Sequence, residues 1–203
     1  MDLSTIISLR ELIDIVLMTL FVGYIFSGFI KAPSPSSYDP VAYYKLPRKK
    51  RLGFSEDFKF AALVTAPAII LHELGHKFTA IAFGAHAQFH AAYSLLILGA
   101  ILKAMNFGFI FFVPAYVTHT ALIHPWQNAL IAFAGPGVNL VLWLGCKYYL
   151  KLFSVKNPVY KQAIILSARI NMYLFFLNMI PLKLFGFSLD GWQVFEGLYR
   201  TFF

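Results

Sequence analysis

The chain has 203 residues, of which 59% are hydrophobic and only 13% are charged, and its formal net charge is +8. Soluble domains carry about 25% charged residues, so this composition argues against an ordinary soluble enzyme. Residues 78–102, 104–123 and 126–146 contain no Lys, Arg, Asp or Glu, and each segment is close to the roughly 20 residues that cross a bilayer. We therefore expect an integral membrane protein whose positive charges face lipid headgroups rather than a nucleic acid.

The first predicted span covers residues 12–30 and is followed by a loop over 32–57. This loop is rich in Pro and Ser and contains a basic cluster at 47–51. A second span is predicted over 58–83. Residues 85–103 begin with an alternation of small and polar side chains, which favours a short re-entrant strand or hairpin.

Three further spans and a short amphipathic helix complete the predicted elements. The spans cover residues 104–123, 126–150 and 161–182, and a connector rich in Gly and Phe leads to a final helix over 192–203. We expect an all-α polytopic bundle of about six transmembrane helices, to which a short re-entrant β-hairpin is added. We divide the chain into residues 1–57, with the first helix and the basic loop, and residues 58–203, the core.

One motif in the second span carries most of the chemistry. It reads His72-Glu73-Leu74-Gly75-His76, and its H-E-x-x-H pattern places two imidazoles on one face of a helix with a carboxylate beside them. Such a helix can hold a zinc ion and present a general base to a water molecule. Ionisable groups are expensive in a membrane helix, so a function is the simplest reason for their presence.

Acidic residues are scarce after Phe58, where only Glu73, Asp190 and Glu196 occur. A catalytic zinc ion takes three protein ligands and a water, and Asp190 is the natural third ligand beside the two histidines. Glu73 then stays off the metal and takes a proton from the water. The alternative for Asp190 is an N-cap of the final helix, a role compatible with metal binding.

With these residues the chain resembles the site-2 protease family of intramembrane zinc metalloproteases, in particular its compact archaeal and bacterial members. The resemblance covers roughly residues 60–203 and rests on three motifs in the family's order. They are the H-E-x-x-H motif at 72–76, Ala-Gly-Pro followed by an Asn at 134–139, and Asn-x-x-Pro leading to Asp-Gly at 178–191.

The resemblance implies that His72, His76 and Asp190 bind one Zn²⁺ and that Glu73 is the catalytic acid/base. It also implies that Asn178 contacts the substrate, and an amide there could donate to a developing oxyanion. A helix-end cap or an interhelical hydrogen bond is the alternative for Asn178. The chain departs from the family's pattern at residues 183–188, which lengthen the segment between Asn178 and Asp190.

Other polar residues receive weaker assignments. Asn139 is a second candidate for substrate contact, but we favour packing, because Gly135 and Gly137 permit close helix approach. His86 and His90 could form a second metal site or contact substrate, although the segment need not be helical. The same segment, residues 85–100, could pair with an unwound substrate as an added strand.

The predicted function is that of an intramembrane zinc metalloendopeptidase in the plasma membrane. Its expected partners are a transmembrane protein or peptide substrate and the lipid bilayer. One alternative is a zinc-binding membrane adaptor or chaperone without proteolytic activity, although a structural zinc site has no need for a base such as Glu73. A second is a transporter or channel that uses His and Asp as an ion path. Metal content and cleavage of a model transmembrane peptide would separate the three.

Overall fold

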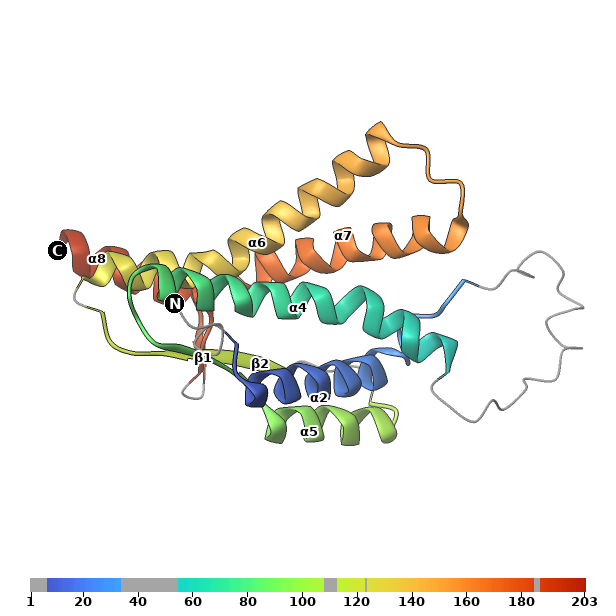
Figure 1. The fold of residues 1–203 in the computed structure, drawn as a ribbon, viewed down its shortest axis with the longest axis horizontal. Helices are drawn as coiled ribbons and strands as arrows, with labels where there is room; N and C mark the ends of the chain where they lie inside the picture. The colour runs from blue at the N-terminus through green and yellow to red at the C-terminus, as the bar shows by residue number, and fades with distance from the viewer. Residues whose placement is uncertain (1–6, 34–54, 108–112, 123, 185–186) are drawn as a thin grey trace, which may run out of the picture.

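The computed structural model describes residues 7–33, 55–107, 113–122, 124–184 and 187–203. Within these ranges it contains six helices and two small antiparallel sheets, and the longer helices run side by side (Figure 1). The basic cluster at 47–51 lies outside the described residues.

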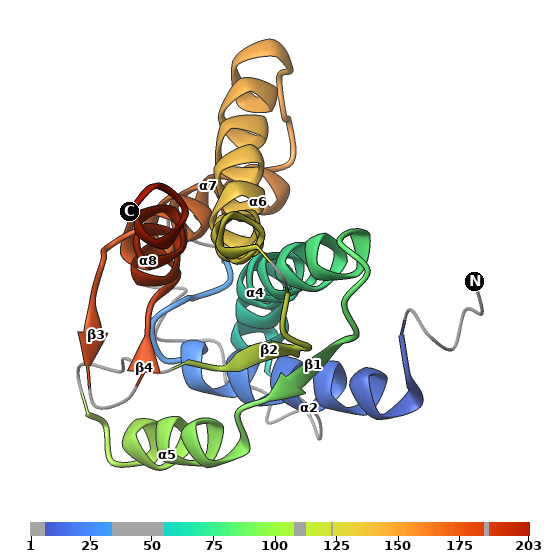
Figure 2. The same cartoon turned by 90° about the vertical axis from the view of Figure 1, so that its left-hand side faces the viewer.

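Helix α4 (Glu56–Ala82) lies at the centre of the molecule. It packs against α2 (Leu9–Phe26) on one side and against α6 (Pro125–Leu152) on the other (Figure 2). Ser55 begins α4 by accepting a hydrogen bond from the backbone of Phe58, which is the usual role of an N-cap serine. The predicted spans over 12–30, 58–83 and 126–150 therefore correspond to helices, with bounds shifted by a few residues.

A buried apolar cluster fixes the side of the molecule that α2 covers. Met18 and Val22 of α2 meet Ile69 of α4, Phe89 of the first strand and Leu96 of the short helix α5 (Tyr93–Ala104). These side chains are between 0% and 8% exposed, so four elements share one core.

The first sheet pairs β1 (Ala87–Ala91) with β2 (Ala115–His119) in antiparallel register. The strand expected within 85–103 is present, but its partner follows α5 rather than a tight turn, so the local hairpin was wrong. The span predicted over 104–123 is also wrong, because 115–119 form a strand. Asn106 has a positive φ of 55° and lies just beyond α5, and aromatic and β-branched residues in β2 favour strand over helix.

Helices α6 and α7 (Pro158–Asn178) form a hairpin, so the helix predicted over 161–182 is present. Of the described helices, α4 and α6 are long and apolar enough to cross a membrane. Helices α5 and α8 (Asp190–Phe202), with 12 and 13 residues, are shorter than a span requires. A bundle of about six spans therefore remains a prediction.

The longer segment before Asp190 folds as a second small sheet. Strands β3 (Lys183–Leu184) and β4 (Phe187–Ser188) are antiparallel. Leu189 N donates to Leu182 O over 3.0 Å and closes the loop. The described residues of this segment thus form two paired strands, and Asn178 and Asp190 still line the same cavity.

Candidate metal site

Three side chains from α4 and α8 converge, and their candidate ligand atoms all lie within 4.8 Å of one another. His72 and His76, 6% and 8% exposed, lie one turn apart on α4 with their Nε2 atoms 3.1 Å apart. Asp190, in the first turn of α8, places Oδ2 3.1 Å from His72 Nε2 and 3.5 Å from His76 Nε2. The N-cap of α8 is Leu189, so Asp190 is not the cap of this helix.

The spacing of these atoms suits a zinc ion. Zinc–nitrogen bonds of about 2.0–2.1 Å in a tetrahedral site imply ligand-to-ligand distances of roughly 3.3 Å, close to the three distances found. Asp190 Oδ2 is buried and has no hydrogen-bond partner, which is costly for an oxygen unless a cation compensates it. Burial raises the pKa of the Asp190 carboxyl, but the neighbouring imidazoles outweigh burial and lower it to about 2.

The outer nitrogen of each imidazole has a fixed partner. His76 Nδ1 lies 2.7 Å from the backbone oxygen of Ile131, and His72 Nδ1 lies 2.6 Å from Asn139 Oδ1. Both partners are on α6. Hydrogen bonds of this kind hold a metal-binding histidine in one orientation and leave its Nε2 for the metal.

Two glycines explain how α6 comes so close to α4. A Cβ on Gly135 would lie 2.3 Å from His76 Nε2 and 2.7 Å from His72 Nε2, and a Cβ on Gly75 would lie 2.9 Å from Ala134 O. No side chain larger than hydrogen fits at Gly135 without moving the imidazoles. Gly135 of the Ala-Gly-Pro motif therefore serves close packing over the site, as the sequence suggested, whereas a Cβ on Gly137 would meet only Phe133 of the same helix.

Glu73 lies beside the converging atoms and is 8% exposed. Among the described residues its carboxylate forms no hydrogen bond. It faces a cavity of about 190 Å³. The residues around this cavity include His72, Glu73, His76, Ala115, Val117, His119, Asn178, Ser188, Asp190 and Gln193.

The two asparagines predicted for substrate contact differ in position. Asn178 ends α7 and lines the cavity, and its side chain has no hydrogen bond to other described residues. Asn139 is fully buried, does not line the cavity, and bonds to His72, Ala68 and Asn171. The structure therefore supports the positioning interpretation of Asn139 over a direct contact with substrate.

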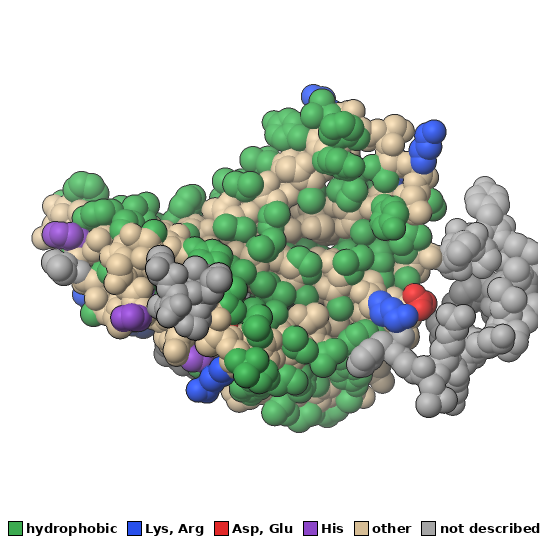
Figure 3. Space-filling view, viewed as in Figure 1, with side chains coloured by type: hydrophobic (Ala, Val, Ile, Leu, Met, Phe, Trp, Pro, Cys, Tyr) green, Lys and Arg blue, Asp and Glu red, His purple; other side chains and the backbone are tan. Residues whose placement is uncertain are grey.

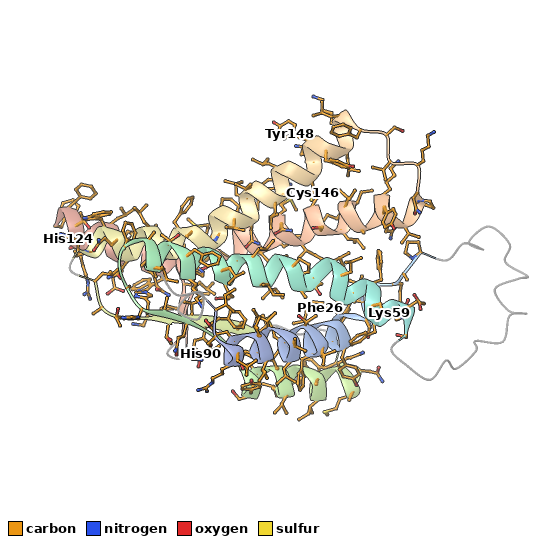
Figure 4. The ribbon with its side chains drawn as sticks, viewed as in Figure 1. Phe26, Lys59, His90, His124, Cys146 and Tyr148 are labelled. Carbon is orange, nitrogen blue, oxygen red and sulfur yellow. The ribbon has the colours of Figure 1, made fainter. Side chains whose placement is uncertain are left out.

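The remaining histidines do not form a second metal group within the described part of the chain. His90 belongs to β1, where it stacks on Tyr116 and contacts Thr118 Oγ1 at 3.0 Å, whereas His124 lies apart from it at the start of α6 (Figure 4). Among the described residues, His86 and His90 therefore do not form the second metal site considered from the sequence. Asn171, which accepts a hydrogen bond from Asn139, was not identified from the sequence. Its signal in the sequence is a polar residue in an apolar helix.

Two known proteins are similar in sequence. The first is the Methanocaldococcus jannaschii protein named "Putative zinc metalloprotease MJ0611", which is 30% identical over 188 residues, covering 92% of this chain and 84% of that protein. The second is the Synechocystis protein named "Putative zinc metalloprotease sll0528", which is 32% identical over 138 residues, covering 68% of this chain and 30% of that protein. No family model and no solved structure match the chain.

Proposed function

The chain belongs to the zinc metalloprotease family of these two relatives, and from that premise we propose that it is an intramembrane zinc metalloendopeptidase of the site-2 protease type. It would hydrolyse peptide bonds within or near the transmembrane segments of other membrane proteins. The observation that carries this proposal is a cavity that Glu73 lines together with His72, His76 and Asp190.

In this proposal each residue of the cavity has a separate task. His72, His76 and Asp190 hold one Zn²⁺, which supplies Lewis acidity to a water and to the scissile carbonyl when bound. Glu73, free of a hydrogen-bond partner among the described residues, takes the proton from the water and returns it to the leaving nitrogen. Asn178 lines the same cavity and donates to the substrate backbone.

The backbone pattern of the first sheet supports substrate binding along β2. Ala92 N donates to Pro114 O and Thr120 N donates to His86 O. Because hydrogen-bonded pairs alternate in an antiparallel ladder, the even-numbered residues of β2 bond to β1. The N–H and C=O groups of Ala115, Val117 and His119 therefore point to the opposite edge, and these residues line the cavity.

The outer edge of β1 is closed to a substrate. Phe89 N donates to Glu11 Oε1 over 2.8 Å and Ala91 N donates to Asp14 Oδ2 over 3.3 Å. Two carboxylates of α2 thus take the place of another strand. The edge available for an unwound substrate belongs to β2, not to residues 85–100 as the sequence suggested.

The surface supports placement in a bilayer. Hydrophobic side chains cover the middle of the visible helical face and charged ones gather toward its ends (Figure 3). In α6, only 33% of the most apolar window is buried inside the protein, so most of this window faces outward. We propose a multi-pass plasma membrane protein whose lipid-facing helices admit the substrate from its own environment.

The deciding experiment compares Glu73→Gln with the unaltered chain, both purified and loaded with zinc. The unaltered chain should cleave a model transmembrane peptide, and a zinc chelator should stop it. Glu73→Gln should keep its zinc and lose cleavage, because an amide cannot accept the proton. The matched control is Glu196→Gln, which changes an exposed Glu paired with Arg200 and should cleave normally. Zinc binding by the unaltered chain without cleavage would point to an adaptor instead.

A further inference from the structure

Two buried asparagines connect the imidazole of His72 to helix α7. Asn139 on α6 is 0% exposed and Asn171 on α7 is 1% exposed. Asn139 Nδ2 donates to Asn171 Oδ1 over 2.8 Å, and Asn171 Nδ2 donates to the backbone oxygen of Ser167 over 2.8 Å. With the His72–Asn139 contact, this chain of hydrogen bonds crosses from α4 through α6 to α7.

Two backbone carbonyl groups determine the direction of every hydrogen bond in this chain, because a carbonyl oxygen only accepts. Ala68 O lies 3.1 Å from Asn139 Nδ2, so that side of the amide is the NH₂ group and Oδ1 faces His72. In the same way, Ser167 O orients the amide of Asn171 and leaves its Oδ1 to accept from Asn139. His72 must then carry its proton on Nδ1, and its Nε2 keeps a lone pair toward Asp190.

We propose that Asn171 is a positioning residue of the metal site, which acts through Asn139 to hold His72 in the tautomer that can bind a metal. The inference rests on the proposed zinc site. The two histidines differ in the kind of atom that orients them. His76 is oriented by a backbone atom, Ile131 O. His72 depends on a side-chain amide that could rotate.

The loss of Asn171 would remove the acceptor for one N–H of the Asn139 amide. Only Ala68 O would then oppose a 180° turn of the amide, and a turned amide would present its NH₂ group to His72 Nδ1. In that arrangement His72 Nδ1 must accept and Nε2 must carry the proton, which prevents metal binding. Because Asn139 is fully buried, no water compensates for the lost partner.

The test measures zinc affinity of the whole purified chain by competition with a chromophoric chelator. Asn171→Leu should weaken zinc binding by about tenfold, at the lower end of the range for such outer partners. Asn171→Asp keeps an acceptor toward Asn139 but loses the donor to Ser167 O, so it should lose less zinc affinity than Asn171→Leu. The control is Thr65→Val, which breaks another buried hydrogen bond of α4, from Thr65 Oγ1 to Ala61 O, and should leave zinc affinity unchanged.

A second pair of variants separates positioning from a general loss of stability. In Asn139→Asp, either carboxylate oxygen accepts from His72 Nδ1, so no rotation can reverse this contact, although the second oxygen now faces Ala68 O and Asn171 Oδ1. Asn171→Leu should therefore cost zinc affinity in the natural background and add no loss in the Asn139→Asp background. Equal losses in both backgrounds, an unchanged affinity for Asn171→Leu alone, or a similar loss in Thr65→Val would each overturn the inference. No substrate is involved, so a failure to cleave peptides would overturn only the proposed function.

Discussion

Gly135 shows at the scale of one residue how the site depends on the absence of a side chain. Its Cα faces both imidazoles, and a methyl group there would lie 2.3 Å from His76 Nε2. Overpacking of this kind costs about 1–3 kcal/mol. The sequence suggested that this glycine permits close packing, but only the structure shows that the imidazoles are what it packs against.

Gly135→Ala should therefore weaken zinc binding by roughly 5- to 150-fold, the equivalent of about 1–3 kcal/mol. Titration with a competing chelator measures the change directly. Gly145→Ala is the matched control, because it lies on the same helix and its added Cβ meets nothing within 4 Å. Equal zinc affinities for the two variants would contradict the close approach of α6 to the metal ligands.

The candidate ligands could be predicted from sequence because neither signal depends on how the helices pack. His72 and His76 follow from helical periodicity, and Asp190 follows from the scarcity of acidic residues after Phe58. Asn171 could not be predicted, because its role depends on the packing of three helices. A polar residue in an apolar helix indicates a buried hydrogen bond but does not identify its partner.

At the scale of elements, the prediction of a span over 104–123 failed for a physical reason. An uncharged segment of that length fits a membrane helix by hydropathy, but hydropathy does not distinguish a partly exposed strand beside the site from a helix. The strand at 115–119 pairs with residues 87–91, which precede it by more than 20 positions. Pairing between distant segments is not encoded in either segment alone.

The edge of β2 gives a prediction at the same scale. Val117→Pro removes an N–H that points away from β1, and proline is tolerated on an edge strand in that position. The variant should keep its zinc and lose most cleavage of a transmembrane peptide, while Val117→Ala should cleave normally. In contrast, Thr118→Pro removes a bond between β1 and β2 and should destabilise the sheet itself. Full activity in Val117→Pro would exclude substrate pairing along this edge.

At the scale of the whole molecule, one buried ion pair joins α2 and β1 to the helix that carries the metal ligands. Lys77 directly follows His76 and pairs with Glu11, and their side chains are 1% and 5% exposed. Glu11 also accepts from Phe89 N and forms a capping box with Ser8. The first helix, the sheet and α4 therefore meet at a single carboxylate.

Lys77→Met should lower the free energy of unfolding by about 3–5 kcal/mol, because it leaves the carboxylate of Glu11 buried without its cation. Adding Glu11→Gln should recover part of this loss, since a neutral amide has no charge to compensate and still accepts from Phe89 N through its oxygen, although its NH₂ group then faces Ser8 N. Thermal unfolding of the single and double variants, followed in the same membrane mimic, measures both changes. If the double variant is less stable than Lys77→Met alone, the hydrogen bonds of Glu11 rather than its charge join α2 to the rest of the molecule.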